Sequence, residues 1–206
     1  MTINLTKAQI DAALPNVAEG LNQYVWLQAN RDERGLRSNP LFRRRFNHFY
    51  RVRRKKEWQD KFYELLERLR GTAAGFPEVF DVLYKATGRY EASFASKLLA
   101  TLDPHMPVID SIVLRNLNLR LPAANSKDRM GRIRQLHSRL LSCFSDYLAT
   151  ENGQYLVKRF RKTYVGTEVT EIKMLDLVLW QTRPKKALPR AQPDARNSAA
   201  RRLALR

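Results

Sequence analysis

The sequence predicts an all-α protein. Apolar residues recur at helical spacing along most of the chain, and no strand-like alternation of apolar and polar residues persists anywhere. Helix-starting residues such as Thr, Asp and Pro precede these apolar stretches, and glycines follow several of them. Together these observations favour a helical domain over residues 1–182.

The composition indicates a polyanionic partner. The chain has 206 residues, enough for one domain with a real core, and carries 38 Lys and Arg against 20 Asp and Glu, for a net charge of +18. Such a surplus is typical of proteins that bind nucleic acid. No apolar run approaches the roughly 18 residues of a membrane helix, and the N-terminus lacks the pattern of a secretory signal. We therefore expect a cytoplasmic, nucleoid-associated protein.

The residues that commonly bind metals are sparse. Cys143 is the single cysteine, which excludes an internal disulfide and a multi-cysteine metal site. The three histidines are dispersed along the chain. We expect neither a metal nor a cofactor.

The first two helices are predicted near the N-terminus. Thr6 and Gln9 have the spacing of a capping box, so a short helix should follow and stop before Pro15. A second helix should cover about residues 17–29, with Val25 on its apolar face.

A strongly basic segment comes next. Residues 31–56 hold eleven Arg or Lys and two acids, with aromatic residues between them. A helix over about 41–54 would turn the aromatic side chains inward, namely Phe42, Phe46, Phe49 and Tyr50. A run of charges is often only a solvated surface, but the scarcity of acids here favours contacts with phosphates.

The spacing of apolar residues from Trp58 to Leu69 predicts an amphipathic helix ending near Gly71. Pro77 at a first-turn position opens another helix, which Gly88 should close.

The second half of the domain contains further helices. Asn125 or Ser126 can cap a long helix that runs to about Thr150, residues 155–160 suggest a short one, and Thr170 can cap the last.

The C-terminal segment differs in composition. Residues 183–206 contain eight Lys or Arg, one Asp and three prolines, without a long apolar face. They predict a mostly disordered basic tail that adds nonspecific affinity for DNA.

Asp110 is the first candidate for chemistry. A helix of small residues precedes a tight turn over 103–107, and a second helix should open at Asp110. Asp is a preferred helix cap, so this position has a purely structural explanation. The same position favours the ionised carboxylate, and a fixed anion can stabilise the oxocarbenium-like transition state of a breaking glycosidic bond.

Lys97 is the second candidate. It lies thirteen residues before Asp110, among small and apolar residues. It is either a surface lysine whose stem lies along apolar neighbours, or a partly buried lysine of lowered pKa that could attack a sugar C1′ and form a Schiff base.

The segment around these residues has a recognisable pattern. It contains Thr87-Gly88-Arg89-Tyr90, then the small-residue helix from Ala92 to Leu102, then the turn Pro107-Val108-Ile109-Asp110. This pattern resembles the helix-hairpin-helix DNA glycosylase superfamily, and more narrowly the 8-oxoguanine-glycosylase-fold proteins of prokaryotes. Residues 46–53 and 173–180 are also similar to that narrower family. The resemblance implies a two-lobed all-α fold with a cleft between the lobes, and a catalytic role for Asp110.

The sequence departs from this family at two points. The family hairpin usually reads Gly-x-Gly, and here only Gly88 is present. Bifunctional members carry their lysine at the start of the hairpin's second helix, near Ala92, and Lys97 lies about five residues further on, a rotation of roughly 140° on a helix. Either the hairpin is remodelled and Lys97 is the nucleophile, or the enzyme is monofunctional and Asp110 activates water.

The resemblance implies a monomeric DNA glycosylase acting on double-stranded DNA. The enzyme would flip one damaged or modified base out of the duplex and cleave its N-glycosidic bond. The base would be an 8-oxoguanine-like lesion, or a modified phage base such as glucosylated hydroxymethylcytosine in phage defence. The residues expected to contact DNA are Arg89, Tyr90, Ser93, Arg43, Arg44, Arg51, Arg53 and Arg115.

Two other classes remain. A noncatalytic DNA- or RNA-binding helical protein would show the same charge. A membrane-surface protein would need a basic amphipathic helix with a broad exposed apolar face, and the sequence has none.

Overall fold

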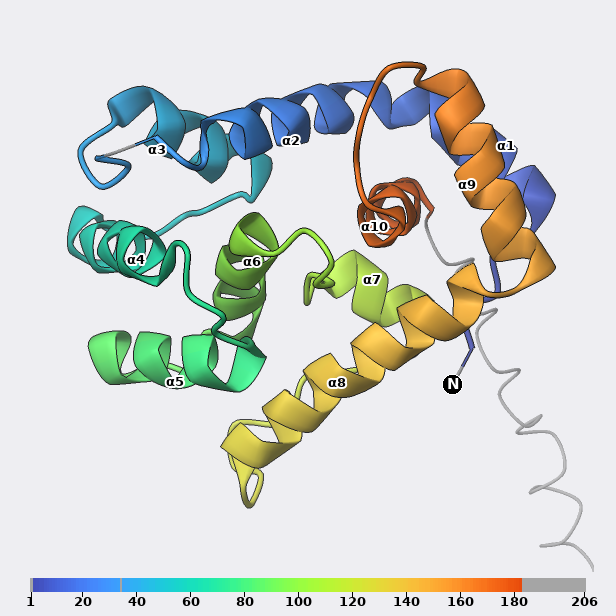
Figure 1. The fold of residues 1–206 in the computed structure, drawn as a ribbon. Helices are drawn as coiled ribbons and strands as arrows, with labels where there is room; N and C mark the ends of the chain where they lie inside the picture. Colours follow the sequence, from blue (N-terminus) through green and yellow to red (C-terminus); the bar gives the residue numbers. More distant parts are fainter. Residues whose placement is uncertain (1, 34, 183–206) are drawn as a thin grey trace, which may run out of the picture.

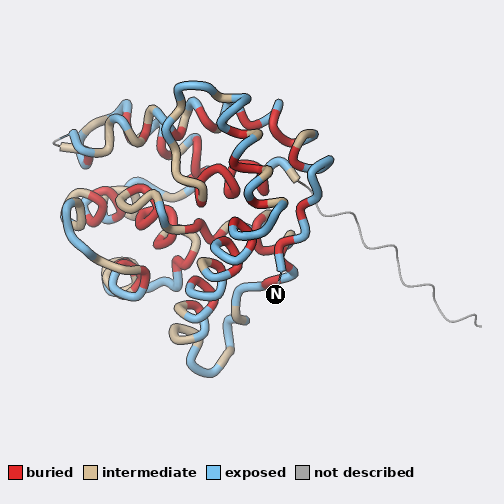
Figure 2. Tube along the Cα trace, turned by 45° about the vertical axis from the view of Figure 1, so that its right-hand side comes forward, coloured by how far each residue is buried: buried red, intermediate tan, exposed pale blue. Residues whose placement is uncertain are grey.

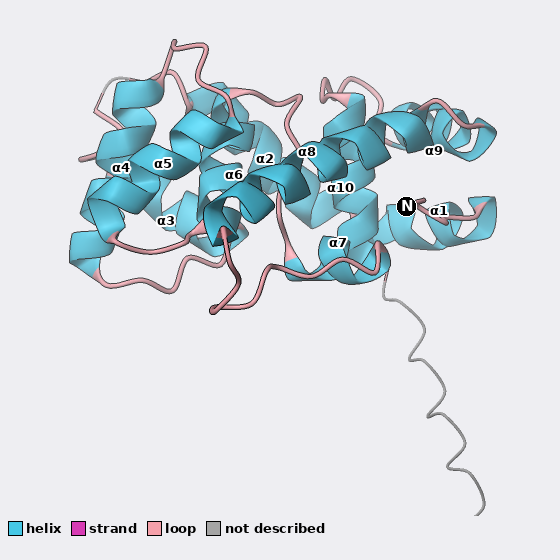
Figure 3. Ribbon diagram, turned by 90° about the horizontal axis from the view of Figure 1, so that it is seen from below, coloured by secondary structure: helices cyan, strands magenta, loops and turns pink. Residues whose placement is uncertain are grey.

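The computed structural model describes residues 2–33 and 35–182, and within these ranges all regular secondary structure is helical (Figures 1 and 3). The helices are α1 (Lys7–Ala13), the 3-10 helix η1 (Leu14–Asn16), α2 (Ala18–Asn30), α3 (Pro40–Phe49), α4 (Lys56–Leu69), α5 (Phe76–Thr87), α6 (Ala92–Leu102), α7 (Ser111–Asn116), α8 (Arg129–Leu148), α9 (Glu151–Thr163) and α10 (Glu171–Gln181). The predicted all-α class is confirmed for this part of the chain. The predicted basic tail lies outside it. Among the helices described, none has the length and apolarity to cross a membrane.

Several helix ends follow from the local sequence as predicted. The Thr6 and Gln9 side chains form the expected capping box of α1. The Thr170 hydroxyl caps α10 by accepting from the backbone N–H of Lys173 at 3.2 Å. Gly88 ends α5 in the left-handed conformation at φ 69°, which a glycine adopts without steric cost.

The prediction that the basic helix reaches residue 54 is wrong, because α3 ends at Phe49. The backbone N–H of Val52 donates to the carbonyl of Asn47 at 2.9 Å, and that of Arg51 donates to His48 at 3.3 Å. These two bonds form a Schellman motif, which requires a left-handed residue after the helix. Arg51 takes that position at φ 53°, where a glycine is usual.

Two further predictions need correction. Asp128, rather than Asn125 or Ser126, caps α8, and its carboxylate accepts from the backbone N–H of Gly131 at 3.1 Å. Val25 does not pack inward, because 38% of it is exposed.

Helices α6 and α10 form the centre of the molecule (Figures 1 and 2). Every residue from Ala95 to Thr101 and from Ile172 to Leu179 is buried. Helices α4 and α5 pack against α6, whereas α7, α8 and α9 pack against α10. The small side chains of α6 allow this close packing from several sides. Any polar group on these two helices is therefore held in the protein interior.

Candidate functional site

The loop that carries Asp110 is fixed from two sides. The backbone N–H of Ile109 donates to the Ser96 hydroxyl at 2.9 Å, which ties the loop to α6. The His137 Nε2 lies 3.2 Å from the carbonyl oxygen of Pro107, which ties it to α8. Asp110 then caps α7, and its Oδ1 accepts from the backbone N–H of Ile112 at 2.7 Å. The half-buried carboxylate is thus held in one position at the mouth of α7, as the sequence predicts.

Lys97 lies in the interior beside this loop. Only 8% of it is exposed, and its Nζ donates to the carbonyl of Tyr50 at 3.1 Å. Burial lowers its pKa, the negative charges of Asp110 and Asp176 act in the opposite direction, and Arg51 lowers it further. The surface-lysine alternative is therefore wrong. Asp110 and Lys97 lie close enough for their charges to interact.

A buried ion pair on α10 completes this group of charges. The Lys173 Nζ and the Asp176 Oδ2 are 2.7 Å apart, and neither residue is exposed to solvent. Within the described ranges, the Asp176 Oδ1 has no hydrogen-bond partner. Burial raises the pKa of Asp176, Lys173 opposes this shift, and Asp110 and Lys97 also influence it. Asp176 is therefore electrostatically connected to both predicted site residues.

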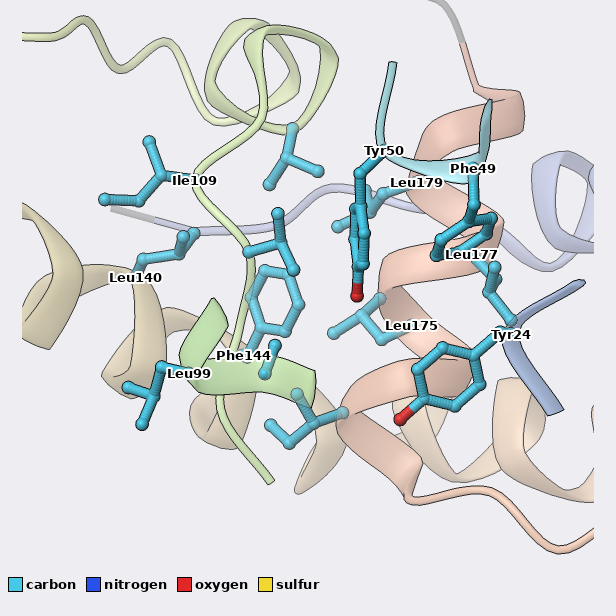
Figure 4. Packing of buried hydrophobic residues seen from close by; sticks show 14 of the residues in the cluster. Tyr24, Phe49, Tyr50, Leu99, Ile109, Leu140, Phe144, Leu175, Leu177 and Leu179 are labelled. Atoms are coloured by element: carbon cyan, nitrogen blue, oxygen red, sulfur yellow. The ribbon is translucent and has the colours of Figure 1, made fainter. Parts of the chain in front are cut away.

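Aromatic side chains contact the two buried ammonium groups. Figure 4 shows Tyr24 and Tyr50 beside α10, in the packed centre of the molecule. The Lys173 Nζ is 4.7 Å from the centre of the Tyr24 ring, and the Lys97 Nζ is 5.1 Å from the centre of the Phe94 ring. Ammonium groups over ring faces are favourably placed, more so when water is excluded. Burial also raises the pKa of the Tyr24 and Tyr50 hydroxyls, which keeps them protonated.

Sequence reasoning missed the α10 pair. The signal was present, because Lys173 and Asp176 interrupt an otherwise apolar stretch at the i, i+3 spacing that places two side chains on one helix face. The burial of that face depends on the surrounding helices, which the spacing alone does not reveal.

The conformation of Arg51 brings backbone strain next to Lys97. Arg51 follows Tyr50, whose carbonyl accepts the Lys97 hydrogen bond, and its φ of 53° is unfavourable for a side chain that lacks local hydrogen bonding. Its side chain is exposed. Strained residues are found disproportionately at functional sites.

The predicted DNA contacts in the basic segment fall into two kinds. The Arg43 guanidinium is engaged internally, 2.7 Å from Asp60 and 4.8 Å from the centre of the Tyr63 ring. Arg44, Arg51 and Arg53 are exposed and make no ion pair with the part of the chain that the structure describes.

The other predicted DNA contacts lie around α6 and α7. Arg89 and Tyr90 are exposed on the turn between α5 and α6, and Ser93 is half-buried in the first turn of α6. Arg115 is exposed on α7, and its Nε donates to the carbonyl of Ser111 at 3.1 Å.

Two cavities lie away from Asp110 and Lys97. One of about 610 Å³ lies beside the start of α10 and is lined in part by Tyr24, Tyr164 and Arg161. The other, of about 400 Å³, lies between α8 and the segment that follows α7. Neither is lined by Asp110 or Lys97. No group of three potential metal ligands occurs in residues 2–33 and 35–182.

Comparison with protein-family models, curated proteins and solved structures finds no match to this chain.

Proposed function

We propose that the protein is a DNA glycosylase with Asp110 and Lys97 at its active site. The observation that carries the proposal is their arrangement: a half-buried carboxylate fixed at a helix mouth, with a buried amine of lowered pKa close enough to interact with it. A buried amine of lowered pKa beside a fixed carboxylate is the kind of arrangement found at many active sites.

The helix arrangement is compatible with the proposed fold family. Helices α5 and α6 are joined by the short turn 88–91, which we take as the hairpin that contacts phosphate. We take α3 to α6 as one lobe and α1, α7, α9 and α10 as the other, with DNA lying across the cleft between them.

The proposed reaction begins with a base flipped out of the duplex. The N-glycosidic bond breaks, its electron pair leaves with the base, and the base takes up a proton. The Asp110 carboxylate stabilises the positive charge that develops on the sugar. In the monofunctional route, water bonds to C1′ and gives its proton to Asp110. In the bifunctional route, the Lys97 amine bonds to C1′ and the opened sugar forms a Schiff base.

The lowered pKa of Lys97 makes the bifunctional route chemically accessible. A lysine attacks only through its neutral amine, and burial increases the neutral fraction of Lys97 near neutral pH. The substrate is either an 8-oxoguanine-like lesion or a modified phage base such as glucosylated hydroxymethylcytosine.

One observation favours a noncatalytic DNA-binding protein as the second candidate. Neither the cavity beside α10 nor the hollow beside α8 is lined by Lys97 or Asp110. A binding protein would need no cavity at these two residues.

Mass spectrometry of released bases distinguishes the two candidates. The protein would be incubated with oxidised, deaminated and alkylated duplexes, and with phage DNA containing hydroxymethylated or glucosylated cytosine. We expect one class of free base to appear. Salt-sensitive DNA binding without release of any base would favour the noncatalytic protein.

Borohydride trapping decides the role of Lys97. In the bifunctional route a covalent protein–DNA adduct forms with the wild type and is absent for Lys97→Gln. Base release without an adduct would assign the monofunctional route, in which Asp110 acts on water.

A further inference from the structure

The hollow between α8 and the segment after α7 is lined by unpaired cations. Arg120 lies on that segment, and Arg132 and Arg139 project from α8 at positions two turns apart. Within the described ranges their guanidiniums make no ion pair and no hydrogen bond. By contrast, Arg134 on the same helix lies 2.5 Å from an Asp81 carboxylate oxygen.

The composition of this hollow suits an anion. No carboxylate lines it, and the Gln135 side chain can add an amide donor. Leu119 and Leu136 form apolar walls, both buried. The three arginines are exposed, so an anion can reach their guanidiniums from solvent. Three like charges around one hollow also repel each other, and a bound anion relieves that repulsion.

The location of the hollow links it to the proposed DNA-binding surface. One turn before Arg132, the Arg129 guanidinium lies 4.7 Å from the centre of the Tyr90 ring, on the α5–α6 turn. The segment that carries Arg120 continues from α7, whose first residue follows Asp110. The hollow therefore lies one helical turn from a residue that contacts the α5–α6 turn, and it also follows α7, which begins at the candidate site.

We propose that Arg120, Arg132 and Arg139 form a binding site for a backbone phosphate of DNA, outside the contacts expected from the sequence. A guanidinium matches phosphate with paired, charge-assisted hydrogen bonds. The volume of about 400 Å³ lies within the range of ligand sites and leaves room for the sugar beside the phosphate. The inference rests on the DNA-binding part of the proposed function and is independent of base release.

The test is the salt dependence of binding to a duplex without modified bases. Neutralising one phosphate contributes about 0.9 to the slope of log K against log salt concentration. We expect Arg132→Gln/Arg139→Gln to lower the slope by about 1 and to weaken binding at least tenfold at low salt. The matched control is Lys158→Gln/Lys162→Gln, two exposed lysines of α9 with the same change in charge.

The control should bind with nearly the wild-type slope. If both double variants lose the same slope and affinity, the effect is one of overall charge and the phosphate site does not exist. Circular dichroism of both variants excludes unfolding as the cause, and Arg132→Lys/Arg139→Lys, which keeps the charge but not the paired donors, should recover only part of the affinity.

Titration with inorganic phosphate distinguishes the source of the anion. If phosphate shifts the NMR signals of these arginine side chains, and a duplex displaces it, the site takes a phosphate of DNA. If free phosphate binds while the double variant keeps the wild-type DNA slope, the proposal is wrong. Because neither measurement uses a modified base, a failed base-release assay leaves this test intact.

Discussion

Most charged side chains of the central helices α6 and α10 are buried, whereas most of those around α3 are exposed. On α6 and α10, Lys97, Lys173 and Asp176 are each at most 8% exposed: Lys173 pairs with Asp176, and Lys97 donates to the carbonyl of Tyr50. Around α3 and the turn after it, arginines such as Arg44 and Arg53 point into solvent. Buried charges change their protonation behaviour, whereas exposed charges mainly set the long-range field. The first region is thus suited to chemistry and the second to holding a polyanion.

The largest effect should come from breaking the buried pair. Asp176→Leu leaves the Lys173 ammonium without a partner in the interior, and such changes cost about 3–5 kcal/mol. Lys173→Met/Asp176→Leu removes both charges and should be within about 1 kcal/mol of the wild type, or more stable. Urea unfolding of the wild type, Asp176→Leu and the double variant measures both changes. A cost below about 1 kcal/mol for Asp176→Leu would show that the pair is not held in the interior as charges.

The next effect is a loss of stability in acid. Burial lowers the pKa of His137 to about 4 from an ordinary value of 6.5. Between these values the unfolded chain binds a proton that the folded chain does not, so acidification destabilises the fold. At pH 4.5 this amounts to about 2.5 kcal/mol, at about 1.4 kcal/mol for each pKa unit.

Comparison with His137→Gln isolates this contribution, since glutamine does not titrate and can still donate to the Pro107 carbonyl. Unfolding free energies of both proteins would be measured at pH 7 and pH 4.5. The wild type should lose about 2.5 kcal/mol more than the variant. If both proteins lose the same free energy of unfolding, His137 is protonated in the folded state at pH 4.5.

Arg51→Gly tests separately the backbone strain at residue 51 and the contribution of its side chain to DNA binding. Glycine adopts the left-handed conformation of the Schellman motif without steric cost, so the variant should gain up to about 1 kcal/mol of stability. It should also bind DNA more weakly, because an exposed guanidinium is lost. Thermal unfolding and fluorescence polarisation measure the two effects. A destabilised variant would show that the Arg51 side chain makes a stabilising contact in the fold.

The smallest stability effect is expected on the exposed surface. Arg44→Gln/Arg53→Gln should change the free energy of unfolding by less than about 0.5 kcal/mol, while the salt dependence of DNA binding weakens. Arg43→Gln is a single-charge control next to Arg44 on α3, since the Arg43 guanidinium pairs with Asp60. The control should lose stability, by up to about 1 kcal/mol, with an unchanged salt slope. A weaker salt dependence for Arg43→Gln, with an unchanged one for Arg44→Gln/Arg53→Gln, would instead place the phosphate contact at Arg43.

The parts of the fold that the sequence predicts are those set by local chemistry. The caps at Thr6 and Thr170 and the end of α5 at Gly88 depend on residues three or four positions away. The helix entry at Asp110 follows from the same rules. The end of α3 was missed because Arg51 stands where such a motif usually has a glycine.

The parts that the sequence does not predict depend on packing between distant segments. Lys97 could equally have been a surface residue, and the burial of Lys173 and Asp176 requires the helices around α10. The arginine hollow exists because the segment after α7 passes beside α8. Residue spacing encodes one face of a helix, and it does not encode what covers that face.

The most direct measurement of the central claim compares Asp110→Asn with Asp103→Asn in single-turnover base release. Both aspartates are half-buried and seven residues apart, and Asp103 accepts from the backbone N–H of His105 in the preceding turn. With protein in excess of the dissociation constant of each variant, we expect Asp110→Asn to release base at least about 100-fold more slowly, the usual loss for one electrostatic stabiliser. It should bind DNA at least as tightly as the wild type, and Asp103→Asn should keep the wild-type rate. Wild-type release by Asp110→Asn would contradict the assignment of the active site.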